Sequence, residues 1–143
     1  MQYRELNGSD LELIDAAFEA IRRNHWPDHH HVGAAVRAGS GKIYVGVHLE
    51  SPGVDVCAEW SAVGSATAAG ERELLCIVAA NCRLLMPPCG VCRELLHYFS
   101  PHMDVIVPTA DGPKKVWISD LLPIPYAQPR PHVGTVRERP AAE

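Results

Sequence analysis

An unbroken apolar segment, Leu-Leu-Cys-Ile-Val-Ala-Ala at residues 74–80, constrains the fold of this 143-residue chain more than any other feature. A strand that is apolar at every position must be covered on both faces, which is typical of a central strand in a parallel or mixed sheet. Helix-compatible segments flank it at residues 57–69 and 90–99. The sequence therefore predicts an α/β fold, a three-layer α/β/α sandwich with a mixed sheet.

The remaining elements can be predicted from periodicity and turn residues. Residues 9–22 are expected to form an amphipathic helix, and Ser9 and Glu12 have the spacing of a capping box at its start. Two strand-like runs at 32–37 and 42–49 around a glycine-rich turn favour a β-hairpin. Farther along the chain we expect two more strands and one helical turn, at residues 105–107, 116–118 and 119–122.

Length and proline distribution predict one domain followed by a tail. A chain of 143 residues suits one compact domain. Residues 123–143 hold five of the twelve prolines and little apolar periodicity. We therefore expect a folded domain over residues 1–126 and a Pro-rich C-terminal tail over 127–143, extended or packed on a neighbouring subunit.

Charge and hydropathy exclude several classes of partner. Lys and Arg number 13 and Asp and Glu 17, so the formal net charge is −4, which is unsuited to binding a phosphate backbone. No stretch approaches the roughly 20 apolar residues of a membrane span, and the N-terminus lacks the form of a signal peptide. We expect a cytoplasmic protein with no nucleic-acid and no membrane partner.

The five cysteines are the candidate chemical groups. An odd number without a secretion signal argues against a disulfide framework. Cys89 and Cys92 have the spacing with which the first turn of a helix chelates one zinc ion, and Cys57, also at a predicted helix start, is the candidate third ligand. The positive ends of two helices would offset the charge of three thiolates. A redox pair at Cys89 and Cys92 is the alternative, but it needs no third cysteine.

Three protein ligands leave a fourth position on zinc for water, which distinguishes catalytic from structural sites. Zinc lowers the pKa of such a water to about 7. A general acid/base must then lie beside the water without binding the metal, and Glu59, two residues after Cys57, fits this role. Arg93 directly follows Cys92 and is expected to compensate the charge of the thiolates.

These residues form a recognisable signature. The segments Cys-Ala-Glu at 57–59 and Pro-Cys-Gly-Val-Cys at 88–92, with 28 residues between them, resemble the zinc-deaminase motif. The Cys-Ala-Glu form is similar to that of the nucleoside branch, cytidine deaminase and blasticidin-S deaminase. Segments 32–35 and 46–50 resemble the first hairpin of that family, and the resemblance covers about residues 10–126.

The resemblance implies a homotetramer (or homodimer) with a five-stranded sheet, an active site completed by neighbouring subunits, and a role in pyrimidine salvage. It implies zinc-dependent hydrolytic deamination of a cytosine-containing nucleoside, cytidine or deoxycytidine. In the mechanism that the resemblance implies, zinc-activated hydroxide would attack the amine-bearing ring carbon. Glu59 would carry a proton to the ring nitrogen and then to the amine, which would leave as ammonia.

The resemblance also implies four substrate contacts, at His48, Glu50, His30 and Ala58. In this family an Asn and a Glu usually hold the sugar hydroxyls. Glu50 matches that Glu, and His48 stands in place of the Asn. His30 stands where a Phe usually packs on the base. The segment at residues 66–80 is more similar to blasticidin-S deaminase than to ordinary cytidine deaminases, so the alternative substrate is blasticidin S or another non-standard aminopyrimidine nucleoside.

Two other functions remain open from the sequence. One is a non-catalytic, zinc-stabilised binding module, in which a fourth side chain such as His30 or His31 closes the metal site. The other is an editing deaminase that acts on RNA or DNA, against which the acidic net charge counts.

Overall fold

The sheet is built around β5 (Leu74–Ala80) in the computed structural model, which describes residues 1–126. β5 pairs antiparallel with β1 (Gly33–Ala38) and parallel with β7 (Asp104–Val107). Two outer strands, β2 (Ile43–Val47) and β8 (Lys114–Trp117), complete a five-strand path in the order β2-β1-β5-β7-β8. A two-residue strand, β6 (Leu85–Met86), pairs with β5 outside this path. The predicted mixed sheet is confirmed, and β6 is an addition that the sequence did not indicate.

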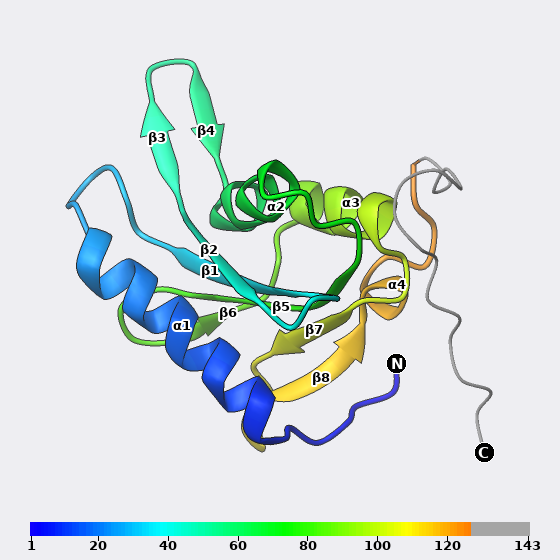
Figure 1. The fold of residues 1–143 in the computed structure, drawn as a ribbon. Coiled ribbons are helices and arrows are strands. Elements are labelled where there is room, and N and C mark those ends of the chain that lie inside the picture. Colours follow the sequence, from blue (N-terminus) through cyan, green and yellow to red (C-terminus); the bar gives the residue numbers. More distant parts are fainter. Residues whose placement is uncertain (127–143) are drawn as a thin grey trace.

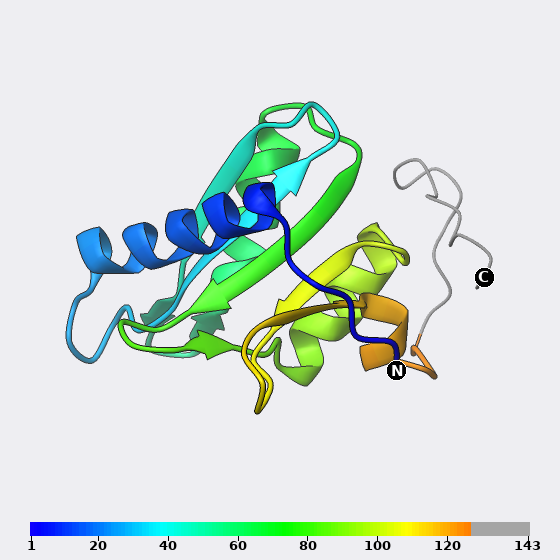
Figure 2. The ribbon, with the colours of Figure 1, turned by 90° about the horizontal axis from the view of Figure 1, so that it is seen from below.

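Helices cover both faces of the sheet (Figures 1 and 2). α1 (Gly8–Asn24) lies on one face, and α2 (Ala58–Ala68) lies with α3 (Gly90–Phe99) on the other. A single turn, α4 (Ile118–Leu121), follows β8. The three-layer α/β/α architecture is therefore as expected.

The side chains of β5 alternate between the two layers. Ile77 and Ala79 belong to the core cluster beneath α2 and α3, whereas Cys76, Val78 and Ala80 belong to the cluster beneath α1. All five side chains are buried. This two-sided burial explains why the strand is apolar at every position.

The predicted capping box at Ser9 and Glu12 is wrong, because α1 begins earlier. Asn7 is the N-cap, and its Oδ1 accepts a hydrogen bond of 3.1 Å from the backbone N–H of Asp10. In return, the backbone N–H of Asn7 donates to Oδ2 of Asp10 over 2.8 Å. The same reciprocal pattern is thus formed two residues nearer the N-terminus.

A second hairpin projects from the main sheet (Figure 1). β3 (Leu49–Ser51) and β4 (Val54–Val56) pair antiparallel, and Gly53 in the turn between them has a φ of 81°. The sequence predicts only the end of the strand at residues 42–49 here, and no second hairpin. Strands of three residues are too short to show an alternating pattern.

The predicted tail, residues 127–143, lies outside the described residues, so the division at residue 126 stays a prediction. Within residues 1–126, no helix is both long enough and apolar enough to cross a membrane.

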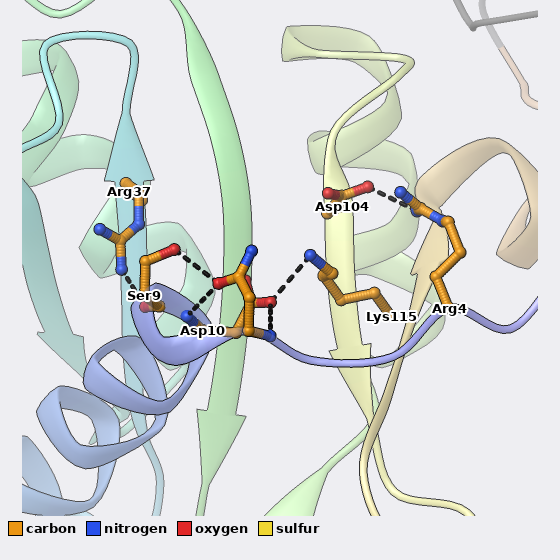
Figure 3. Close-up of polar contacts among 7 residues, drawn as sticks. Arg4, Ser9, Asp10, Arg37, Asp104 and Lys115 are labelled. Carbon is orange, nitrogen blue, oxygen red and sulfur yellow. Dashed lines mark hydrogen bonds and ion pairs between the residues drawn. The ribbon is translucent and has the colours of Figure 1, made fainter.

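Three ion pairs hold the N-terminal region against β7 and β8: Glu5 pairs with Lys114, and the other two are drawn in Figure 3. Arg4 Nη2 lies 2.5 Å from Oδ1 of Asp104, and Lys115 Nζ lies 2.8 Å from Oδ2 of Asp10. The Arg4 guanidinium also lies 4.0 Å from the centre of the Trp117 ring. Because Asp10 and Asp104 are buried, each carboxylate depends on its cationic partner for compensation.

α2 packs directly on β2 because Gly46 has no side chain. A Cβ at Gly46 would lie 2.2 Å from the backbone N of Ala62 and 2.6 Å from the carbonyl O of Ala58. Ala58, Ala62 and Ala66 recur every fourth residue on the buried side of α2. Small residues on both surfaces bring the helix close to the sheet and place its first residues, next to Cys57, beside α3.

We expect Gly46→Ala to destabilise the protein by about 1–3 kcal/mol, because the new methyl group forces α2 away from β2. Urea unfolding of the variant and the parent protein measures this difference. Gly64→Ala is the matched control: Gly64 lies in α2 with open space around it, so this variant should be stabilised by about 0.5–1 kcal/mol. Equal stability of Gly46→Ala and the parent would contradict the close packing.

Candidate metal centre and active site

Three cysteine sulfurs converge at the N-termini of two helices. Cys57 is the N-cap of α2, Cys89 is the N-cap of α3, and Cys92 lies in the first turn of α3. The partial positive charge of a helix N-terminus stabilises nearby anions, so both helices favour the ionised form of these thiols. The structure therefore brings together the three cysteines predicted from the sequence.

The separations of the sulfurs suit one zinc ion. Sγ of Cys57 and Sγ of Cys89 are 3.7 Å apart, and the three Sγ atoms all lie within 4.8 Å of one another. Two thiolates on a tetrahedral zinc with Zn–S bonds of about 2.3 Å are about 3.8 Å apart. The donor set also fits, because thiolates are ligands that zinc binds well. These residues could hold the metal.

The binding-module alternative needs a fourth side chain on this cluster. Neither predicted candidate is there: His31 groups with His48 and Glu50, and Nδ1 of His30 donates a hydrogen bond of 2.6 Å to the carbonyl of His48. Among residues 1–126, the cluster comprises the three cysteines alone. A site of this kind leaves a coordination position for water or substrate.

The thiols differ in acidity. Burial raises the pKa of Cys57 and, more strongly, that of the fully buried Cys92. Burial also acts to raise the pKa of Cys89, but hydrogen bonds from Cys92 and Cys57 outweigh it, and the pKa of Cys89 lies below its usual value. Cys89 is thus the most readily ionised sulfur, and the other two would lose their protons on binding a cation.

Glu59 lies in the first turn of α2 and is only 6% exposed. Burial raises the pKa of its carboxyl, and hydrogen bonds to its own backbone and to the Cys92 thiol act in the opposite direction without cancelling the effect of burial. The carboxyl is therefore next to the sulfurs but is not part of the three-sulfur cluster.

A pocket borders the sulfurs and the carboxyl. Its lining is largely apolar with a few polar groups, as is typical of small-molecule sites. The lining residues are Val32, His48, Cys57, Ala58, Glu59, Met86, Pro87 and Cys89. Two of the predicted substrate contacts, His48 and Ala58, are thus in the same pocket as the predicted acid/base.

The other predicted site residues do not line this pocket. His30 supports the segment that carries His48, through the hydrogen bond to its carbonyl. Glu50 is half-exposed on β3. Arg93 donates from Nε to the carbonyl of Pro88 and from Nη1 to the carbonyl of Leu121. Substrate contact by His30 and Glu50 and charge compensation by Arg93 stay predictions.

Asp55 is a residue of this region that the sequence analysis misses. Its carboxylate is hydrogen-bonded to Nε2 of His48. The pair depends on the β3–β4 hairpin, which brings β4 back beside the end of β2. A Pro-Gly pair at residues 52–53 is the only signal of a turn there, and it does not indicate which side chains the turn brings together.

Comparison with known proteins agrees with this site. The family model for the cytidine and deoxycytidylate deaminase zinc-binding region matches residues 8–108. Blasticidin-S deaminase of Bacillus cereus is 34% identical over 139 residues, which cover 90% of this chain and 99% of that protein. Cytidine deaminase of Halalkalibacterium halodurans is 32% identical over 117 residues, which cover 78% and 89%.

Solved structures show the same fold. Cytidine deaminase from Burkholderia pseudomallei is 29% identical with a TM-score of 0.70, covering 85% of this chain and 100% of that one. Cytidine deaminase from Mycobacterium tuberculosis has a TM-score of 0.72 at 24% identity, covering 85% and 99%. The family inferred from the sequence motifs is confirmed: this chain belongs to the cytidine and deoxycytidylate deaminase family, whose zinc-binding region it contains.

Proposed function

We propose that this protein catalyses the zinc-dependent hydrolytic deamination of a cytosine-containing nucleoside, cytidine or deoxycytidine, or of a close analogue. One observation carries the proposal. Three sulfurs at a separation that suits zinc lie beside a buried carboxyl at the wall of a largely apolar pocket, in a chain of the deaminase family.

In this proposal, Cys57, Cys89 and Cys92 hold the zinc ion. Zinc bound there would supply a Lewis acid that lowers the pKa of a coordinated water to about 7. Glu59 moves the protons: its carboxyl lines the pocket, accepts a proton from the attacking water and delivers protons to the ring nitrogen and to the amino group, which leaves as ammonia. Arg93 adds positive charge next to the thiolates.

The pocket walls orient the base. Val32, Met86 and Pro87 supply apolar surface for a planar ring, and the small side chain of Ala58 leaves room beside Glu59. His48 lies at the same pocket and is oriented by Asp55, so it is placed to contact the non-base part of the substrate. Glu50 on β3 and His30 in the loop before β1 are the other two proposed substrate contacts.

Blasticidin S or a related analogue is the second candidate substrate. The relative called blasticidin-S deaminase matches 90% of this chain, against 78% for the cytidine deaminase of Halalkalibacterium halodurans. His48 in place of the usual Asn also favours a group other than a free ribose at this position.

We also infer that the protein acts in the cytoplasm, in pyrimidine salvage, without a nucleic-acid partner. A site of three thiolates needs a reducing compartment, and all five cysteines are free. The net charge of −4 disfavours contact with a phosphate backbone.

We infer a homotetramer, the assembly that the family resemblance implies, and the surface beside the site supports contact between copies of the chain. A hollow next to Cys57 is lined by exposed apolar side chains, among them Val54, Trp60 and Val91. Such a patch is typical of an interface. Sedimentation equilibrium of the zinc-loaded protein should give four copies, a dimer would correct the number, and a monomer would contradict the inference.

An absorbance assay with cytidine, deoxycytidine and blasticidin S tests the function. We expect turnover of at least one of them, and a loss of about 10²–10⁴-fold in Glu59→Gln, because the variant cannot transfer protons. Glu19→Gln, an exposed substitution on α1, is the control. No turnover of any aminopyrimidine by zinc-loaded protein, or full activity of Glu59→Gln, would refute the proposed reaction.

Metal analysis tests the ligands separately. We expect one zinc per chain in the parent protein and in Glu59→Gln, and loss of zinc with lower thermal stability in Cys89→Ser, because bound metal stabilises the fold. Cys82→Ser, at an exposed free cysteine outside the cluster, should keep its zinc. Retention of zinc by Cys89→Ser would overturn the ligand assignment.

A further inference from the structure

Outside the sulfur cluster, the described residues bring one other set of metal-ligating side chains together. His31, His48 and Glu50 each offer a ligand atom, and these atoms all lie within 4.8 Å of one another. We propose that this set, called the rim site below, binds a second divalent transition-metal ion, and that an ion there inhibits the enzyme. The inhibition, but not the binding, rests on the proposed function.

The distance between His31 and Glu50 suits a shared ion. His31 Nε2 lies 3.7 Å from Oε2 of Glu50, which is too long for a hydrogen bond. A nitrogen and an oxygen bound at about 2.1 Å to one tetrahedral ion are about 3.4 Å apart. The two side chains are half-exposed, so a small adjustment of either side chain completes the geometry.

His48 has the environment of a metal-bound histidine. Its Nε2 is hydrogen-bonded to the carboxylate of Asp55, and its Nδ1 is buried without a hydrogen-bond partner among residues 1–126. Ligating histidines almost always donate their other ring N–H to a carboxylate or carbonyl, which fixes the tautomer and the ring. Nδ1 is therefore the His48 ring nitrogen that has no hydrogen-bond partner within the described part of the chain and is free to bind an ion.

The backbone around the rim site is braced. The loop that carries His31 is joined to the end of β2 by two hydrogen bonds: Nδ1 of His30 donates to the carbonyl of His48 over 2.6 Å, and the backbone N–H of His48 donates to the carbonyl of Val32 over 2.8 Å. The rings of His31 and His48 have centres 5.6 Å apart. The ligands are therefore held near one another before an ion arrives.

The donor set predicts which ions bind. Two imidazoles and one carboxylate suit Zn²⁺, Cu²⁺ and Ni²⁺, whereas Mg²⁺ and Ca²⁺ prefer oxygen ligands alone. The rim site lacks thiolates, and His31 and Glu50 must lose side-chain freedom on binding. It should therefore bind zinc more weakly than the sulfur cluster and fill after it.

Occupancy of the rim site would obstruct the pocket. His48 lines the pocket together with Cys57 and Glu59, so an ion bound to His48 fixes a side chain of the pocket wall. The ion also removes His48 and Glu50 from contact with the substrate. We therefore expect inhibition that is competitive with substrate, with a higher apparent KM and little change in kcat.

Equilibrium dialysis against Zn²⁺, starting from protein with one zinc per chain, tests the binding. We expect a second equivalent in the parent protein and none in His31→Gln or Glu50→Gln. His29→Gln is the matched control, because His29 lies in the same loop with its ring on Trp26, outside the rim site, and should keep the second equivalent. A parent protein that stops at one equivalent, or a second equivalent that persists in either variant, overturns the proposal.

Kinetics test the inhibition separately. Added Zn²⁺ should raise the apparent KM of the parent protein and of His29→Gln several-fold, and it should leave the KM of His31→Gln unchanged. Equal sensitivity of His31→Gln would overturn the inhibitory role. If none of the aminopyrimidines is turned over, the proposed function fails, and the dialysis result alone still decides whether the rim site binds metal.

Discussion

The proposed chemistry depends on one electrostatic arrangement: three sulfurs gathered where two helix N-termini meet. Three thiolates on a divalent ion carry a net charge near −1, and the dipoles of α2 and α3 offset it. The helices are placed by packing rather than by the sulfurs themselves. Gly46 and the small residues Ala58 and Ala62 let α2 lie directly on β2, and the same face of the sheet supports α3. A carboxyl, Glu59, is buried beside the sulfurs as a consequence of this packing.

Much of this site could be predicted from the sequence because its determinants are local. The two cysteines of α3 are three residues apart, and Glu59 follows Cys57 by two, so each set shares one helical turn. The central strand was equally predictable, because burial on two faces leaves an unbroken apolar run. Only the meeting of the two helices depends on long-range packing; from the sequence it was inferred from Cys57 as a candidate third ligand and from the resemblance to a known family.

The features that could not be predicted depend on contacts between distant residues. Two pairs near the start of α1 have capping-box spacing, and the pair that forms contains Asp10, whose carboxylate also pairs with Lys115 on β8. The histidine tract at residues 29–31 does not show by itself which distant side chains lie beside it. In the structure His31 lies beside Glu50, and His48 is oriented by Asp55, because an unpredicted hairpin folds back there. Two metal-ligating clusters of different chemistry, thiolate and imidazole–carboxylate, result.

The central claim is that three cysteines alone hold the metal and leave one position open. X-ray absorption at the zinc edge, on protein with one zinc per chain, tests it most directly. We expect three sulfurs at about 2.3 Å from the zinc and one oxygen ligand. We expect no outer-shell signal from an imidazole. Four protein ligands around the zinc, whether four sulfurs or three sulfurs and a histidine nitrogen, would contradict it.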